Sequence, residues 1–193
     1  MSNSTRRRSL DTERLVYFSL FTALVVILQC MASFVFPKIG LSLNLSLIPI
    51  VLGVALCGRY TGAWLGFVSA FIILFDPTTA GFMTFNAPAT IFLVLFKGVM
   101  AGLVAGLVYD LFFKMNKTLA VFLAAVAAPI VNTGIFLAGC FIFYVDLVVA
   151  DAGGANALGH VLTAWIGINF VIELLVNAVF APTISKLIDI SKK

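Results

Sequence analysis

Residues 87–109 read APATIFLVLFKGVMAGLVAGLVY, an apolar run that contains one charged side chain, Lys97. A helix needs about 20 mostly apolar residues to cross the hydrocarbon core of a bilayer. This run has the required length. The stretch therefore predicts a membrane-spanning helix.

The composition of the whole chain agrees with this prediction. Hydrophobic residues make up 62% and charged residues 10% of the 193 residues. A soluble domain typically contains about 25% charged residues, because it must cover its surface. The composition therefore excludes a cytosolic globular enzyme, a disordered chain and a disulfide-stapled secreted domain. The net charge of +4 is not clustered in one patch, so nucleic-acid binding is not expected.

Five further apolar stretches complete a pattern of six spans. The predicted spans are Leu15–Phe36, Leu41–Gly58, Tyr60–Phe75, Ala87–Tyr109, Thr118–Tyr144 and Val161–Ile184. Pro49 lies inside the second span, and the sixth is expected to end near Pro182. The first span is longer than the core of a signal peptide, so we expect it to be retained. The sequence thus predicts an all-α integral membrane protein, with a six-helix membrane domain over residues 15–185.

The basic residues predict the orientation of this domain. Lys and Arg favour the cytoplasmic side of short loops. With six spans, all 12 basic residues except Lys38 and Lys97 fall on one side. Both the N-terminal segment (residues 1–14) and the basic tail (residues 186–193) are therefore predicted to be cytoplasmic. The opposite side carries two long connectors, which we interpret as loops: Asp76–Ala87 and Val145–His160.

Small residues recur at every fourth position in two regions. They form two rows, Gly58, Gly62 and Gly66 in one and Gly98, Gly102 and Gly106 in the other. Such rows let helix backbones approach closely. They indicate either packing within the chain or a docking face for a partner helix, and the sequence leaves both interpretations open.

Polar side chains at similar depth in the last three spans indicate a cavity for a solute. A charged side chain near the bilayer centre costs about 2.5–3.5 kcal/mol on insertion scales, so Lys97 and Glu173 should face the protein interior. Other polar side chains lie on the same helix faces or at the same depth. The predicted ligand-binding residues are Asn86, Lys97, Asn132, Thr133, Trp165, Asn169 and Glu173.

Two alternatives to this hypothesis stay open. Lys97 and Glu173 can form an ion pair that only ties two helices together. Trp165 can stack on a ring of the ligand, or it can anchor the span at the membrane interface, where tryptophan is common. His160 is interpreted as an ordinary solvent-exposed residue, and Gln29 as an isolated local hydrogen-bonding group.

The sequence lacks the motifs of an enzyme or an ATPase. It has no G-x-x-x-x-G-K-[ST], no H-E-x-x-H and no G-x-S-x-G. The three cysteines show no C-x-x-C spacing and His160 is the single histidine, so no metal or redox site is expected. We predict no catalytic residue and no cofactor. Because no inverted repeat of the secondary-carrier kind is evident, we expect a ligand-capturing subunit that depends on partners for energy.

Three stretches carry a family resemblance. They are LSLNLSLIPIVLGVALCGRYTGAWLGFVSAF (41–71), FNAPATIFLVLFKGVMAGLVAGLVYDLF (85–112) and APIVNTGIFLAGCFIFY (128–144). They resemble the substrate-specific (S) components of energy-coupling factor (ECF) transporters, in the branch for pantothenate, pyridoxine, riboflavin and related vitamins. A basic residue followed by small residues, and an Asn-Thr in the fifth span, are familiar in that branch. The matching residues here are Lys97, Gly98, Ala101, Gly102, Asn132 and Thr133.

The resemblance implies capture of a B-type vitamin or related micronutrient in the plasma membrane of a prokaryote. The S component would dock on an ECF transmembrane coupling subunit, which two cytoplasmic ATPase subunits drive. In this family small residues of the first span contact the coupling subunit, and Ser19 and Ala23 match them here. Pantothenate is slightly favoured as the ligand because Lys97 suits a carboxylate. The alternative function is a membrane assembly or scaffold protein without its own solute.

Overall fold

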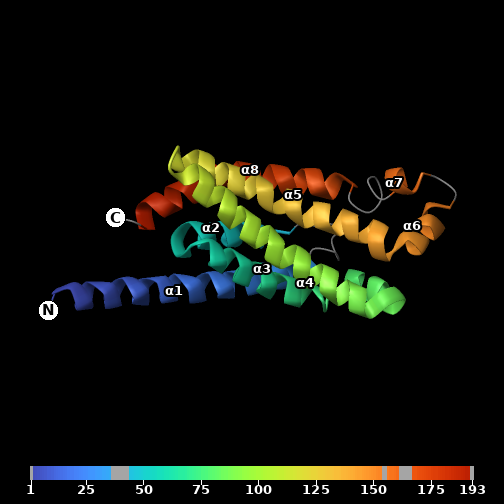
Figure 1. The fold of residues 1–193 in the computed structure, drawn as a ribbon, viewed down its shortest axis with the longest axis horizontal. Coiled ribbons are helices and arrows are strands. Elements are labelled where there is room, and N and C mark those ends of the chain that lie inside the picture. The colour runs from blue at the N-terminus through green and yellow to red at the C-terminus, as the bar shows by residue number, and fades with distance from the viewer. Residues whose placement is uncertain (1, 36–43, 154–155, 161–166, 192–193) are drawn as a thin grey trace.

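The computed structural model describes residues 2–35, 44–153, 156–160 and 167–191, where every regular element is helical. The elements are α1 (Ser2–Cys30), the π-helical η1 (Met31–Val35), α2 (Leu47–Cys57), α3 (Arg59–Ile73), α4 (Pro77–Phe113), α5 (Lys117–Phe143), α6 (Val145–Ala152), α7 (Ala157–His160) and α8 (Gly167–Ser191). Figure 1 shows the long helices packed along one axis. Three segments are long and apolar enough to cross a membrane: Thr12–Val35, Pro77–Phe113 and Lys117–Phe143. The structure thus fits the predicted all-α membrane protein, and the count of six spans stays a prediction.

The two ends of the bundle differ in what they carry. Figure 1 shows that α1 begins and α8 ends at one end of the molecule, which we call the terminal end. There the guanidinium of Arg14 donates to the carbonyl oxygen of Cys57 over 2.7 Å. The hydroxyls of Thr118 on α5 and Ser185 on α8 lie 3.1 Å apart. The helices α6 and α7 lie at the opposite end, which we call the α6 end.

Helices α3 and α4 approach each other backbone to backbone through glycine. Gly62 faces Gly102, and Gly66 faces Gly98, so closely that a Cβ atom on any of the four would overlap backbone or side-chain atoms of the facing helix. Of the two interpretations of the glycine rows, the structure supports packing within the chain. These faces are occupied and are not open to a partner helix.

The hydrophobic core joins most of the long helices. Val51 of α2, Leu65 of α3 and Ile184 of α8 belong to one buried cluster and are each at most 1% exposed. Large apolar side chains also cover the outside of the bundle, where Phe92 is 58% and Ile142 is 68% exposed. An apolar outer surface of this kind suits a lipid environment.

The predicted loop Asp76–Ala87 is wrong, because this segment is helical up to a kink. Asp76 caps the helix by accepting a hydrogen bond from a backbone N–H of the first turn over 2.8 Å, and Pro77 occupies the start of α4. Such a cap followed by proline starts a helix efficiently. The backbone leaves helical geometry at Asn86, whose Oδ1 accepts from the backbone N–H of Ala89 over 3.2 Å. Asn86 thereby caps the second part of α4.

Three further expectations about element boundaries need correction. The connector Val145–His160 is not a plain loop, since it contains α6 and α7. The last helix continues through Pro182 to Ser191, because side chains on both sides of the proline pack in the core. Helix α2 begins at Leu47, which places Pro49 in its first turn, where proline is tolerated.

Gln29 is the centre of a buried polar cluster rather than an isolated group. Its Oε1 accepts hydrogen bonds from the hydroxyls of Ser46 over 2.9 Å and Ser69 over 2.7 Å. Its amide nitrogen donates to the hydroxyl of Ser33 over 3.1 Å. The cluster therefore ties α1 and η1 to the start of α2 and to α3.

Candidate ligand-binding site

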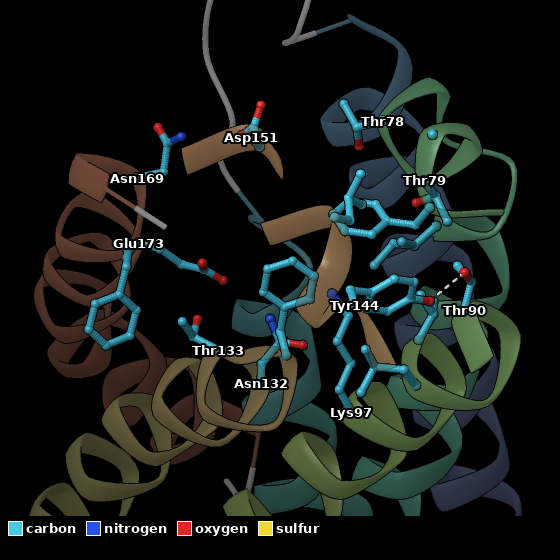
Figure 2. A pocket seen from close by; sticks show the side chains of 18 residues that line it. Thr78, Thr79, Thr90, Lys97, Asn132, Thr133, Tyr144, Asp151, Asn169 and Glu173 are labelled. Atoms are coloured by element: carbon cyan, nitrogen blue, oxygen red, sulfur yellow. Dashed lines mark hydrogen bonds between the residues drawn. The ribbon is translucent and has the colours of Figure 1, made fainter. Parts of the chain in front are cut away.

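A cavity of about 580 Å³ lies in the half of the molecule near α6 and is bordered by α3, α4, α5, α6 and α8. Pockets for small ligands commonly measure about 300–1,000 Å³. The polar residues that line the cavity, labelled in Figure 2, are Thr78, Thr79, Thr90, Lys97, Asn132, Thr133, Tyr144, Asp151, Asn169 and Glu173. Apolar and aromatic side chains make up the rest of the wall. The cavity thus has the size and mixed lining of a site for a vitamin-sized solute.

Lys97 reaches the cavity from the middle of α4. The neighbouring Gly98 packs against Gly66 of α3, which fixes the face that α4 turns toward the cavity. The ammonium of Lys97 lies 5.0 Å from the centre of the Phe136 ring. This is a cation–π contact, which leaves the ammonium hydrogens available to an acceptor.

Glu173 enters the cavity from α8, across from Lys97. Figure 2 shows the two side chains pointing into the cavity from different sides, with Asn132 of α5 between them. Within the described residues no ammonium–carboxylate contact of 4.0 Å or less joins Lys97 to Glu173. Oε1 of Glu173 is buried and has no hydrogen-bond partner in that part of the chain. The direct ion pair considered as an alternative is therefore not formed.

The structure brings five of the predicted binding residues to this one cavity. They are Lys97, Asn132, Thr133, Asn169 and Glu173. Among the described residues the side-chain amide of Asn132 makes no hydrogen bond, so both its donor and its acceptor can serve a ligand. The arrangement places a cation, a carboxylate and neutral amides around a single space.

Two predicted binding residues are placed differently. Asn86 is not among the lining residues, because its side chain caps the second part of α4. Trp165 lies outside the described residues. The roles of both in ligand binding stay predictions.

An aromatic wall was missed by sequence reasoning. The Phe82 ring lies edge-on to Phe136 at 5.8 Å and to Tyr144 at 5.2 Å between ring centres. The Tyr144 hydroxyl lies 2.6 Å from that of Thr90, which itself donates to the carbonyl oxygen of Asn86 over 2.7 Å. Since the single proton of the Thr90 hydroxyl is used in that second bond, Tyr144 donates to Thr90. No sequence signal separates these aromatics from the many that face outward.

His160 is not the ordinary exposed residue that the sequence suggested. Its Nε2 lies 2.8 Å from a carboxylate oxygen of Asp151, and the two side chains are 25% and 52% exposed. Because Asp151 also lines the cavity, this contact joins α7 to the cavity rim formed by α6.

The predicted partner-docking residues lie apart from the cavity. Ser19 and Ala23 are exposed on α1, and α1 contributes no residue to the cavity lining. The two sites are therefore separate surfaces of the molecule.

Comparison with protein families gives one match, which spans the helices that form the site. The family described as "ECF transporter, substrate-specific component" matches residues 13–185, which include every lining residue of the cavity. Comparison with curated proteins and with solved structures finds no match. Members of this family are membrane transport subunits, not enzymes, that take a small-molecule substrate and associate with an ECF module. Because the match covers nearly the whole chain, this protein belongs to the family of substrate-specific components of ECF transporters.

Proposed function

We propose that the cavity captures a B-type vitamin or related micronutrient, and that Lys97 binds an anionic or carbonyl group of it. The observation that carries this proposal is the ammonium of Lys97 in a cavity of about 580 Å³, with no carboxylate in contact among the described residues. An ammonium left unpaired at this depth is costly unless a ligand neutralises it. Asn132 and Asn169 supply hydrogen bonds, and pantothenate is favoured because its carboxylate suits Lys97.

The proposed membrane arrangement has six crossings, made by α1, α2, α3, α4, α5 and α8, over residues 15–185. Two contacts at the terminal end support it. Arg14 of α1 contacts Cys57 at the end of α2, and Thr118 at the start of α5 contacts Ser185 near the end of α8, as expected if each helix crosses once. The terminal end carries the described basic residues other than Lys97 and is cytoplasmic in this arrangement. The cavity then lies nearer the outer face of a prokaryotic plasma membrane.

The proposed partners are an ECF transmembrane coupling subunit and two cytoplasmic ATPase subunits. The family membership supports association with an ECF module. The exposure of Ser19 and Ala23 on α1 suits a helix that packs against a partner in the membrane. Small side chains there allow close approach without disturbing the cavity.

Native mass spectrometry of the detergent-purified chain tests the proposed function directly. We expect a stoichiometric small molecule of vitamin size. The variant Lys97→Ala should lose about 2–5 kcal/mol of binding, which is roughly 30-fold or more in Kd, while still inserting in the membrane. Lys114→Ala is the matched control, because Lys114 is exposed at the terminal end of α4.

The scaffold alternative makes the opposite prediction. A protein without its own solute would purify empty and would show no thermal stabilisation by any vitamin of a panel. If the wild type and Lys97→Ala bind the ligand with equal affinity, vitamin capture stands but Lys97 is not a ligand contact.

A further inference from the structure

The carboxylate of Glu173 has an unused acceptor inside the cavity. Its Oε1 is buried without a hydrogen-bond partner in the described part of the chain. Asn177, one turn further along α8, donates instead to the backbone carbonyl oxygen of Glu173 over 2.9 Å. A buried acceptor without a donor costs free energy. A group that donates to the Glu173 carboxylate is therefore expected outside α8.

Lys97 does not supply the missing donor. No contact of 4.0 Å or less joins its ammonium to Glu173, and the ammonium lies over the Phe136 ring. Asn132 lies between the two charged groups (Figure 2) and, among the described residues, also makes no side-chain hydrogen bond. The cavity therefore holds a donor pole at Lys97 and an acceptor pole at Glu173, and neither pole is satisfied by the other.

A ligand with one kind of polar group fits this arrangement poorly. A simple anion would satisfy Lys97 but would leave Glu173 without a donor and add a second negative charge to the same space. A molecule that carries an acceptor at one side and a donor at the other satisfies both poles at once. Its middle would lie against the aromatic wall of Phe82, Phe136 and Tyr144.

We propose that the substrate is a two-pole molecule: Lys97 binds its carboxylate or carbonyl group, and its hydroxyl, amide N–H or amine group donates a hydrogen bond to the carboxylate of Glu173. This proposal rests on the proposed function and narrows its substrate class. It makes Glu173 a ligand contact and excludes monocarboxylates that have no separate donor. It also requires that Glu173 contributes nothing to the stability of the empty protein.

The test compares Glu173→Leu with the wild type in two measurements on the detergent-purified chain. The first is the thermal unfolding of the empty protein. Replacing a buried unpartnered carboxylate by an apolar side chain of similar size should leave the unfolding temperature unchanged or raise it. The second is the affinity for five probes. Pantothenate, biotin and riboflavin carry a carboxylate or carbonyl group and a separate donor, whereas nicotinate and lipoate carry a carboxylate and no separate donor.

We expect at least one of the three donor-bearing probes to bind the wild type, and nicotinate and lipoate to bind at least roughly 30-fold more weakly. Glu173→Leu should weaken binding of the donor-bearing probe by a similar factor. Leu175→Ala is the control, because Leu175 lies on the same helix and is 57% exposed. It should bind like the wild type.

Three results would overturn the proposal while the capture function stands. They are unchanged affinity of Glu173→Leu, wild-type binding of nicotinate or lipoate as tight as that of the donor-bearing probes, and a clear fall in the unfolding temperature of empty Glu173→Leu. A wild type that binds none of the five probes and carries no co-purified molecule would overturn the capture function as well.

Discussion

The hydroxyl of Tyr144 begins a short hydrogen-bond chain that ties the cavity wall to the kink of α4. Tyr144 donates to Thr90, and Thr90 donates to the carbonyl oxygen of Asn86. The Tyr144 side chain is only 1% exposed, so its hydroxyl has no ready access to water as a substitute partner. The kink and the aromatic wall are thus coupled by two bonds.

We predict that Tyr144→Phe lowers the free energy of unfolding by about 0.5–1.5 kcal/mol, the usual value of one hydrogen bond. Thr90→Val removes both bonds of the chain and should cost more. The double variant should cost less than the sum of the two single variants, because both remove the same bond. Thermal or denaturant unfolding of the three variants in detergent measures this, and strictly additive effects would contradict the proposed chain.

At the scale of helices, the glycine contact of α3 with α4 brings two backbones together. Gly66→Ala and Gly102→Ala each place a methyl group on the backbone of the facing helix. Overpacking of this kind costs about 1–3 kcal/mol, because the helices must move apart. We expect each variant to unfold at a lower temperature and to lose the monodisperse peak in size-exclusion chromatography sooner on heating.

Gly134→Ala is the matched control for this prediction. Gly134 also lies within a long helix, α5, but a Cβ atom there meets no heavy atom within 4 Å. Alanine should be neutral or stabilising at this position, because glycine loses more backbone entropy in a helix. Equal loss of stability in all three variants would show that the glycine contact is not the cause.

The buried cluster around Gln29 makes a second prediction about helices. Gln29→Leu removes the shared acceptor of Ser46 and Ser69, and both hydroxyls lie in a buried setting. The expected loss is about 1–3 kcal/mol, the cost of leaving buried polar groups unsatisfied. Ile27→Ala is a control on the same helix, because the Ile27 side chain is 57% exposed. A Gln29→Leu variant as stable as Ile27→Ala would contradict the role of this cluster in joining the helices.

The positions of helices were predictable where a long apolar run determines them. They were less predictable where a single capping residue determines where the helix begins. The long apolar runs at Ala87–Tyr109 and Thr118–Tyr144 correspond to parts of α4 and to α5. The segment that starts at Asp76 was misjudged because its threonines and glycine are typical of loops. One carboxylate that accepts a backbone hydrogen bond, followed by proline, was sufficient to begin a helix there.

At the scale of the whole molecule, the proposed orientation can be measured by labelling single cysteines. In a background in which Cys30, Cys57 and Cys140 are replaced by alanine, Met115→Cys and Ala150→Cys place one thiol at each end of the bundle. Both positions are exposed, Met115 between α4 and α5 and Ala150 on α6. A membrane-impermeant maleimide should label Ala150→Cys in intact cells and Met115→Cys only after permeabilisation. Labelling of both from the same side would contradict the crossing by α5, and the reverse labelling pattern would contradict cytoplasmic termini.

The cavity itself was predictable only in part. The charges Lys97 and Glu173 stand out because charged residues are rare within apolar runs, and their similar depth indicated a shared space. The aromatic wall was not predictable, because aromatic residues make up 13% of the chain and many of the described ones are exposed, without a distinguishing pattern. Which of them turn inward depends on the kink at Asn86 and on the end of α5 at Tyr144, and these are features of the folded bundle.

The glycines that join α3 to α4 and the side chains that line the cavity are different residues, and this affects how such proteins diverge in evolution. At Gly62, Gly66, Gly98 and Gly102 two backbones touch, so nearly every substitution there is harmful. The groups proposed to select the ligand lie on α4, α5 and α8, at Lys97, Asn132 and Glu173, and none of them contributes to the α3–α4 glycine contact. Selection can therefore exchange one nutrient for another by single changes in the cavity while the scaffold stays the same. Descendants of one ancestor can then differ in ligand while still fitting the same coupling machinery.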